Sequence, residues 1–262
     1  MSFEAELRTA HAAAADAAEL LVRGSGTEDV REKARADLVT SVDMEAEAAI
    51  IRRISAHFPD DVIIAEESES TVSSSGRRWI VDPLDGTVNF VHGHPFACVS
   101  IALVDDGGPA AGVVNAPFLR EVYHATRGGG AYLNGKPLRV SAVTDGARSL
   151  LATGFPFKPG KGDPETYFRL VADLLAATHG VRRAGAAALD LAYVAAGRVD
   201  AFFELGLAPW DMAAGLLLVT EAGGEVGGWP GDSSGPLITG RLVASNGHIH
   251  DWLSGHLGRY EF

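Results

Sequence analysis

The sequence contains a single cysteine, Cys98, among its 262 residues. One chain therefore cannot form an internal disulfide, and it has no set of cysteines for a zinc site. This composition favours a reducing compartment. The first residues, Met1–Glu6, are acidic where a signal peptide carries positive charge, and we expect a cytoplasmic protein.

Long apolar runs and clusters of basic residues are also missing. No apolar segment approaches the roughly 20 residues that a membrane-spanning helix requires. The chain carries 22 Lys and Arg against 34 Asp and Glu, for a formal net charge of −12, and its basic residues are scattered. Such a surface disfavours direct binding to nucleic acids or anionic membranes. A phosphorylated ligand would therefore need metal ions at its site.

What the sequence does contain is a series of short apolar runs and helical segments typical of an α/β protein. Helices are predicted over residues 3–22, from Asp43 onward, and over 164–178, 187–196 and 212–222. In the second helix, the spacing of Met44, Ala48, Ile51 and Ile54 predicts the apolar face. Strands are predicted over residues 62–64, 78–81, 96–104, 111–115, 122–125, 131–133, 138–141, 149–153, 180–183 and 201–204.

This order predicts a single domain over residues 1–262. Its first half, about 1–145, would hold a mixed, largely antiparallel sheet with helices, because adjacent strands there are separated by short turns. Its second half, about 146–262, would alternate strand and helix.

The strongest candidate for a functional site is the stretch 79–90, Trp-Ile-Val-Asp-Pro-Leu-Asp-Gly-Thr-Val-Asn-Phe. An apolar strand through Val81 is expected to end at Asp82 and Pro83, because proline donates no ladder hydrogen bond. Asp82 and Asp85 crowd together, and neighbouring carboxylates repel each other unless a cation lies between them. The residues after Asp85 can begin a helix, whose free N–H groups bind phosphate.

Further acids stand at predicted strand ends or helix starts, namely Asp43, Glu66 and Asp211. Each alone has a simpler explanation, since Asp commonly caps helices and exposed acids are solvated. Together with Asp82 and Asp85 they indicate hard oxygen ligands for Mg²⁺. Such a site suits metal-assisted attack of water on a phosphate ester.

Several motifs resemble the inositol monophosphatase family of Mg²⁺-dependent, lithium-sensitive phosphatases, and they span nearly the whole chain. They are Asp-Leu-Val-Thr-Ser-Val-Asp ending at Asp43, Ala-Glu-Glu-Ser beginning at Ala65, the stretch 79–90, and Trp-Asp-Met-Ala-Ala-Gly over 210–215. The segments 153–157 and 182–190 resemble bacterial members most. The resemblance implies a layered α-β-α-β-α sandwich and, commonly, a homodimer.

The resemblance also implies a ligand set for two to three Mg²⁺ ions, with Mn²⁺ as a substitute and Li⁺ as an inhibitor. Glu66, Asp82 and the carbonyl group of Leu84 would hold the first ion. Asp82, Asp85 and Asp211 would hold the second, and a third, looser ion would share Glu66.

Catalytic and substrate-binding roles follow from the same resemblance. Thr87, hydrogen-bonded to Asp43, would orient and help deprotonate the attacking water, and Glu66 would complete the catalytic set. The residues implied in substrate binding are Asp85, Gly86, Thr87, Gly185, Ala187, Glu204 and Asp211.

Two positions depart from the family pattern and bear on the substrate. Ala186 stands where relatives usually carry Ser or Thr, and Lys33 falls only near a lysine of the family. The resemblance implies hydrolysis of myo-inositol monophosphate, an inositol-phosphate phosphatase activity. Fructose 1,6-bisphosphate, histidinol phosphate and adenosine 3',5'-bisphosphate stay open as alternative substrates. An additional protein-binding role in transcription also stays open, since some bacterial relatives have one.

Overall fold

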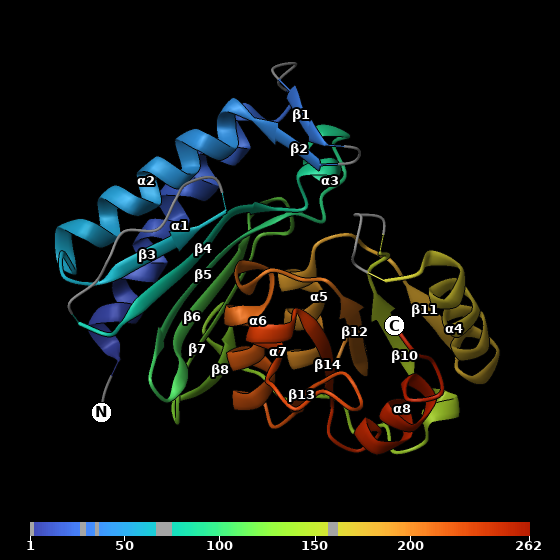
Figure 1. Ribbon diagram of the computed structural model, residues 1–262. Coiled ribbons are helices and arrows are strands. Elements are labelled where there is room, and N and C mark those ends of the chain that lie inside the picture. The colour runs from blue at the N-terminus through green and yellow to red at the C-terminus, as the bar shows by residue number, and fades with distance from the viewer. Residues whose placement is uncertain (1–2, 27–29, 35–36, 67–74, 157–161) are drawn as a thin grey trace.

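The computed structural model describes residues 3–26, 30–34, 37–66, 75–156 and 162–262, which form alternating layers of helix and sheet (Figure 1). Helices α1 (Glu4–Gly24) and α2 (Ser41–His57) pack on the outer face of a seven-stranded sheet. Helices α5 (Ala187–Ala195) and α6 (Pro209–Glu221) lie between this sheet and a five-stranded sheet. Helices α4 (Pro164–Ala177) and α8 (His250–Leu257) cover the other face of the second sheet. The expected layered α-β-α-β-α sandwich is confirmed.

The seven-stranded sheet has the order β3-β4-β5-β6-β7-β8-β9. Its strands are β3 (Val62–Ala65), β4 (Arg78–Asp85), β5 (Cys98–Asp105), β6 (Gly108–Ala116), β7 (Glu121–Thr126), β8 (Gly130–Leu133) and β9 (Lys136–Pro137). Only the β3–β4 pair is parallel. A separate antiparallel hairpin of β1 (Val30–Ala34) and β2 (Asp37–Thr40) was not predicted.

The predicted strand over residues 138–141 is wrong. Val140 donates its N–H to the carbonyl group of Ala222 at 3.2 Å, and the Ser141 hydroxyl donates to Asp200 at 2.5 Å. Because these partners belong to the second half of the chain, the segment leaves the first sheet after β9.

The five-stranded sheet has the order β11-β10-β12-β14-β13. Its strands are β11 (Gly180–Arg182), β10 (Leu150–Thr153), β12 (Ala201–Leu205), β14 (Arg241–Ser245) and β13 (Glu225–Gly228). Strand β10 is parallel to both β11 and β12, whereas β14 is antiparallel to β12 and β13.

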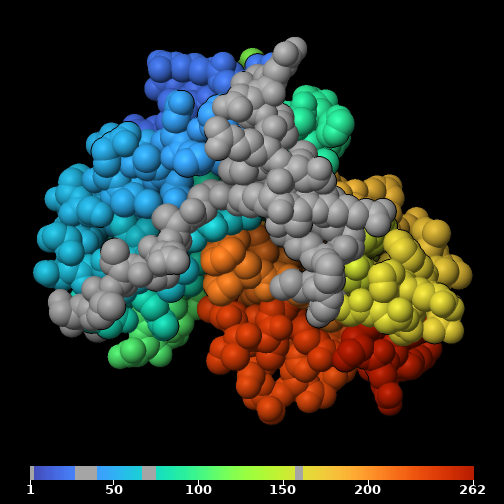
Figure 2. Space-filling view, turned by 45° about the horizontal axis from the view of Figure 1, so that its top comes forward, coloured from blue at the N-terminus to red at the C-terminus, as the bar shows by residue number. Residues whose placement is uncertain are grey.

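Helix α8 and the short helix α7 (Pro236–Thr239) were not predicted. The division into halves near residue 145 stays a prediction. Figure 2 shows a face on which α1 and α2, in blue, and the second half, in yellow to red, are both visible.

Helix α2 buries a different face from the predicted one. Met44 is 58% exposed and Ala48 is exposed, so that only Ile54 of the predicted face is buried. The helix begins at Ser41 with Thr40 as its N-cap, and its packed face carries Val42, Ala46, Ile50 and Ile54. These residues recur at every fourth position, which is one stripe of an α-helix.

Strand β4 does not end at Pro83 as predicted. Asp82 pairs with Ser100 and Asp85 pairs with Cys98, with an irregular register between the two pairs. A bulge of this kind accommodates a proline, because the bulged residues need not donate to the ladder. The buried end of β4 therefore carries both acids into the interior.

Within the described ranges, every helix is too short or too polar to traverse a lipid bilayer.

Candidate active site

A cavity of about 280 Å³ opens where the end of β4 meets β12 and the first turns of α3 (Thr87–Val91), α5 and α6. Among its lining residues are all the predicted metal and substrate positions: Glu66, Asp82, Leu84, Asp85, Gly86, Thr87, Gly185, Ala187, Glu204 and Asp211. Asp43 is the one predicted site residue that does not line it. Segments 145 residues apart in sequence, from Glu66 to Asp211, thus meet in one place.

The acids from β4 are deeply buried. Asp82 is 1% exposed and Asp85 is 8% exposed. Burial raises the pKa of both carboxyl groups well above the usual range, and nearby acids raise them further: Glu66, Asp85 and Asp211 act on Asp82, and Asp211 and Glu66 on Asp85. Carboxylates gathered in this way repel one another strongly unless a cation joins them.

Backbone amides fix the orientation of these carboxylates. Leu84 donates its N–H to Asp82 at 3.0 Å, within the β4 bulge. Ala188, in the first turn of α5, donates to Asp85 at 2.7 Å from 103 positions away. The third acid, Asp211, accepts from the amide of Ala208 at 2.6 Å, at the start of α6. These three hydrogen bonds fix the positions of the acids from within the protein.

The donor set fits a hard divalent cation. In the part of the chain that the structure describes, no three His, Cys, Asp or Glu side chains form a complete ligand cluster. Mg²⁺ does not need one, since it typically takes one or two carboxylates per ion and completes its shell with water and phosphate oxygens. The predicted side-chain ligands of the metal are all carboxylates, and a cation would relieve the repulsion among them.

The segment after Asp85 forms a tight turn that begins α3. Gly86 has φ +90° and serves as N-cap of α3, and a Cβ atom there would lie 2.9 Å from the carbonyl oxygen of Phe96. Only glycine fits this position. The Thr87 hydroxyl donates to the carbonyl group of Leu84 at 3.1 Å, which places both groups on the cavity side of the turn.

Asp43 lies one layer away, at the start of α2. Its carboxylate accepts from the amide of Thr40 at 3.0 Å and from the Thr40 hydroxyl at 2.5 Å. The Asp43 amide in turn donates to the Thr40 hydroxyl oxygen at 3.4 Å, which completes a capping box. The predicted hydrogen bond between Asp43 and Thr87 stays a prediction. The side chain of Lys33 and the motif residues Glu67, Ser68 and Phe157 lie outside what the structure describes.

Residues of the second half form another side of the cavity, which we call the second-sheet wall: Gly154, Phe155, Arg183, Asp190 and Glu204. Burial and then Asp211 raise the pKa of Glu204 to about 8. A Cβ atom at Gly154 would lie 2.0 Å from the Glu204 carboxyl group, so this carboxyl group rests directly on the glycine. The guanidinium carbon of Arg183 lies over the ring of Phe155, 5.7 Å from the ring centroid.

Sequence reasoning assigned no role to Gly154, Phe155, Arg183 or Asp190. These four residues belong to the segments 153–157 and 182–190, which resemble bacterial members of the family most. Ala186, a departure from the family pattern, is 1% exposed and also lines the cavity.

The sequence matches the profile of the inositol monophosphatase family over residues 4–260. The protein named Nus factor SuhB of Escherichia coli is 47% identical over 247 residues, covering 93% of this chain and 92% of that protein. The inositol-1-monophosphatase of Synechocystis is 44% identical over 241 residues, covering 90% and 83%.

Solved structures agree with the sequence comparisons. The crystal structure of extragenic suppressor protein SuhB from Bartonella henselae superimposes with a TM-score of 0.91 at 43% identity, covering 97% of this chain and 98% of that one. The structure of inositol monophosphatase from Anabaena gives a TM-score of 0.88 at 38% identity, with coverage of 100% and 98%.

Proposed function

The chain belongs to the inositol monophosphatase family, and we propose that it hydrolyses phosphate monoesters with Mg²⁺, with myo-inositol monophosphate as its preferred substrate. The observation that carries this proposal is the group of buried carboxylates beside the glycine that begins α3. A cation would relieve the repulsion among these carboxylates, and the turn would offer a phosphate site next to it.

The carboxylates divide into two ligand groups in this proposal. Glu66, Asp82 and the carbonyl group of Leu84 would hold one ion, and Asp82, Asp85 and Asp211 another, with Glu66 shared by a looser third. Bound divalent ions supply the positive charge that the carboxylates lack and make water acidic enough to attack near neutral pH. The amides of Leu84 and Ala188 keep Asp82 and Asp85 in position throughout.

The turn after Asp85 positions the other reactants. The N–H groups of Gly86 and Thr87 would bind the phosphate, and the Thr87 hydroxyl, supported by Asp43, would orient the attacking water and take part in removing its proton. Phosphoryl transfer requires mainly positioning and charge stabilisation, with little covalent chemistry from the protein. Gly185, Ala187 and Glu204 would contact the polyol.

The test is phosphate release by the purified protein with Mg²⁺, with and without Li⁺. Asp85→Asn should lower kcat by roughly a thousandfold or more, because it removes charge and positioning at the reacting phosphate. Asp106→Asn makes the same chemical change at an exposed position and should leave kcat as it is. Near-wild-type turnover by Asp85→Asn would refute the mechanism.

The choice of substrate is decided by a panel. Myo-inositol monophosphate should give a higher kcat/KM than fructose 1,6-bisphosphate, histidinol phosphate and adenosine 3',5'-bisphosphate. A preference for any of these three would keep the chemistry and replace the substrate.

A second function is favoured by the names of the relatives, several of which are called Nus factor SuhB. We propose a protein-binding role in transcription beside the phosphatase activity, in a cytoplasmic homodimer. The acidic chain, with net charge −12, suits a basic protein surface better than a nucleic acid. A cellular phenotype that survives Asp85→Asn would support this role, whereas loss of phenotype together with activity would argue against it. Light scattering on the purified protein tests the dimer.

A further inference from the structure

We propose that Asp190 is a specificity-determining residue, which together with Glu204 binds hydroxyl groups of a polyol monophosphate in the cavity. The inference rests on the proposed phosphatase function and deepens it, because it assigns the part of the site that recognises the alcohol. It also predicts which substrates the second-sheet wall disfavours.

Asp190 occupies a rigid position beside the acids of β4. It lies in the first turn of α5, where its own N–H donates to the carbonyl group of Ala186 at 2.9 Å. The same turn carries Ala188, whose N–H holds Asp85 at 2.7 Å. The position of Asp190 relative to Asp85 is therefore fixed by a helix and not by a loop.

The carboxylate of Asp190 is buried, lines the cavity and receives no hydrogen bond from any residue that the structure describes. Its exposed fraction is only 3%. The charged groups that face it are Glu204, Asp85 and Arg183. Two of these are acids, and Arg183 is an exposed side chain at the cavity rim, over Phe155. A buried carboxylate normally finds a donor, so the geometry points to a donor supplied by the ligand.

The chemistry of the wall selects the kind of ligand group. A polyol carries several hydroxyl groups, each with one O–H donor, so it can donate to Asp190 and to Glu204 at once. A phosphate dianion has only acceptor oxygens and offers Asp190 no donor. The wall therefore favours a polyol that carries one phosphate, held at the metal-binding end, over a substrate with a second phosphate group.

The competing explanation is that Asp190 merely stabilises the N-terminus of α5, as acids in a first helical turn commonly do. The two explanations differ in what the residue does to substrate choice. A structural role would affect all substrates equally, whereas recognition of hydroxyl groups would affect only substrates that have them.

The experiment compares kcat/KM for myo-inositol 1-phosphate with that for p-nitrophenyl phosphate, which has no hydroxyl group, using the full chain with Mg²⁺. Asp190→Asn should lower the ratio of the two values roughly tenfold, the effect of one hydrogen bond, and mainly through KM for the inositol ester. Asp190→Ser is the second variant, should the first fold poorly.

Asp200→Asn is the matched control. Asp200 is 6% exposed and binds the Ser141 hydroxyl and the amide of Leu150, at 2.5 and 2.6 Å, away from the cavity. This variant should lower the melting temperature and keep the substrate ratio. An equal loss on both substrates, or an unchanged ratio, in both Asp190 variants would overturn the proposal. Absence of any phosphatase activity in the wild-type protein would instead refute the proposed function, and the inference with it.

Discussion

Gly154 shows how one missing side chain shapes the cavity. The Glu204 carboxyl group occupies the space that a Cβ atom at residue 154 would need, 2.0 Å away. The backbone of Gly154 does not have a positive φ, so alanine is compatible with its conformation. An added methyl group would therefore displace the flexible end of the Glu204 side chain and not the backbone.

We predict that Gly154→Ala raises KM for an inositol monophosphate roughly tenfold, because Glu204 must turn away from the substrate. The free energy of unfolding should change by less than about 1 kcal/mol. Steady-state kinetics and urea unfolding measure the two effects. Gly255→Ala, in α8 with no atom within 4 Å of the added Cβ, is the control and should keep KM. Equal KM values in both variants would contradict the role of Gly154.

The residues of the site differ in how well sequence reasoning finds them. Asp82 and Asp85 stand in an unusual local sequence, and Glu66 is found because it follows a predicted strand. Asp190 gives no such signal, because an acid in a first helical turn is common for electrostatic reasons alone. Its role depends on Glu204, 14 positions later and on another element, which only the folded chain brings beside it.

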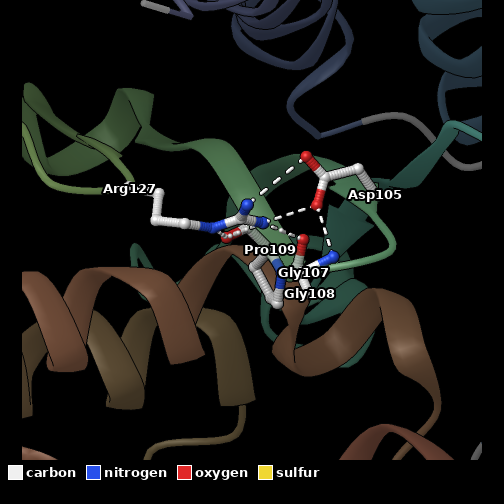
Figure 3. A network of polar contacts seen from close by, with 5 residues as sticks. All are labelled: Asp105, Gly107, Gly108, Pro109 and Arg127. Carbon is white, nitrogen blue, oxygen red and sulfur yellow. Dashed lines mark hydrogen bonds and ion pairs between the residues drawn. The ribbon is translucent and has the colours of Figure 1, made fainter. Parts of the chain in front are cut away.

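At the level of elements, the side chain of Arg127, the residue after β7, binds the turn of the β5–β6 hairpin (Figure 3). Arg127 donates to Asp105 at 2.7 Å and to the carbonyl groups of Gly108 and Pro109 at 2.5 and 3.1 Å. The amide of Gly107 donates to Asp105 at 2.8 Å. Hydrogen bonding to Arg127 lowers the pKa of Asp105 from its usual value. One guanidinium group thus holds a turn and the strand beyond it.

Arg127→Met should lower the free energy of unfolding by about 1–2 kcal/mol, since it removes the guanidinium donor from Asp105 and from two carbonyl groups. Urea unfolding measures the change, and kcat should stay as in the wild type, because the hairpin does not line the cavity. Arg8→Met removes an exposed i,i+4 pair with Glu4 at 3.8 Å and should cost less than about 0.5 kcal/mol. A similar loss of unfolding free energy in both variants would show that the Arg127 contacts stabilise the protein no more than an exposed ion pair does.

Helices and strands could be predicted where a local sequence pattern determines them. They could not be predicted where pairing with residues distant in sequence determines them. The antiparallel strands β5 and β6 follow from apolar runs around a turn. The β4 bulge was missed, because Pro83 looks like a strand end until Ser100 and Cys98 pair on either side of it. The order of layers could be expected only from the family resemblance, because α5 and α6 touch both sheets through residues far apart in sequence.

At the scale of the whole molecule, a pair of histidines lies in the seam between the outer helices and the first sheet. The ring of His11 in α1 contacts the ring of His124 in β7 edge-on, with 4.6 Å between the ring centroids. The His124 ring stacks on that of Tyr132, with 5.2 Å between the centroids. Burial lowers the pKa of His11. Burial and the neighbouring His11 lower the pKa of His124 to about 4.

These shifts couple the stability of the fold to pH. Between pH 6.5 and about 4 the unfolded chain binds protons at these histidines that the folded chain does not, so stability falls as the pH is lowered through this window. His124→Phe removes one of the two groups and keeps a ring against Tyr132. We predict that the free energy of unfolding, measured in urea from pH 4 to pH 7, depends less steeply on pH in this variant than in the wild type. The same substitution at the exposed His94 controls for loss of a histidine as such. An equal flattening in both variants would mean that the seam between α1 and the sheet is not the origin of the pH dependence.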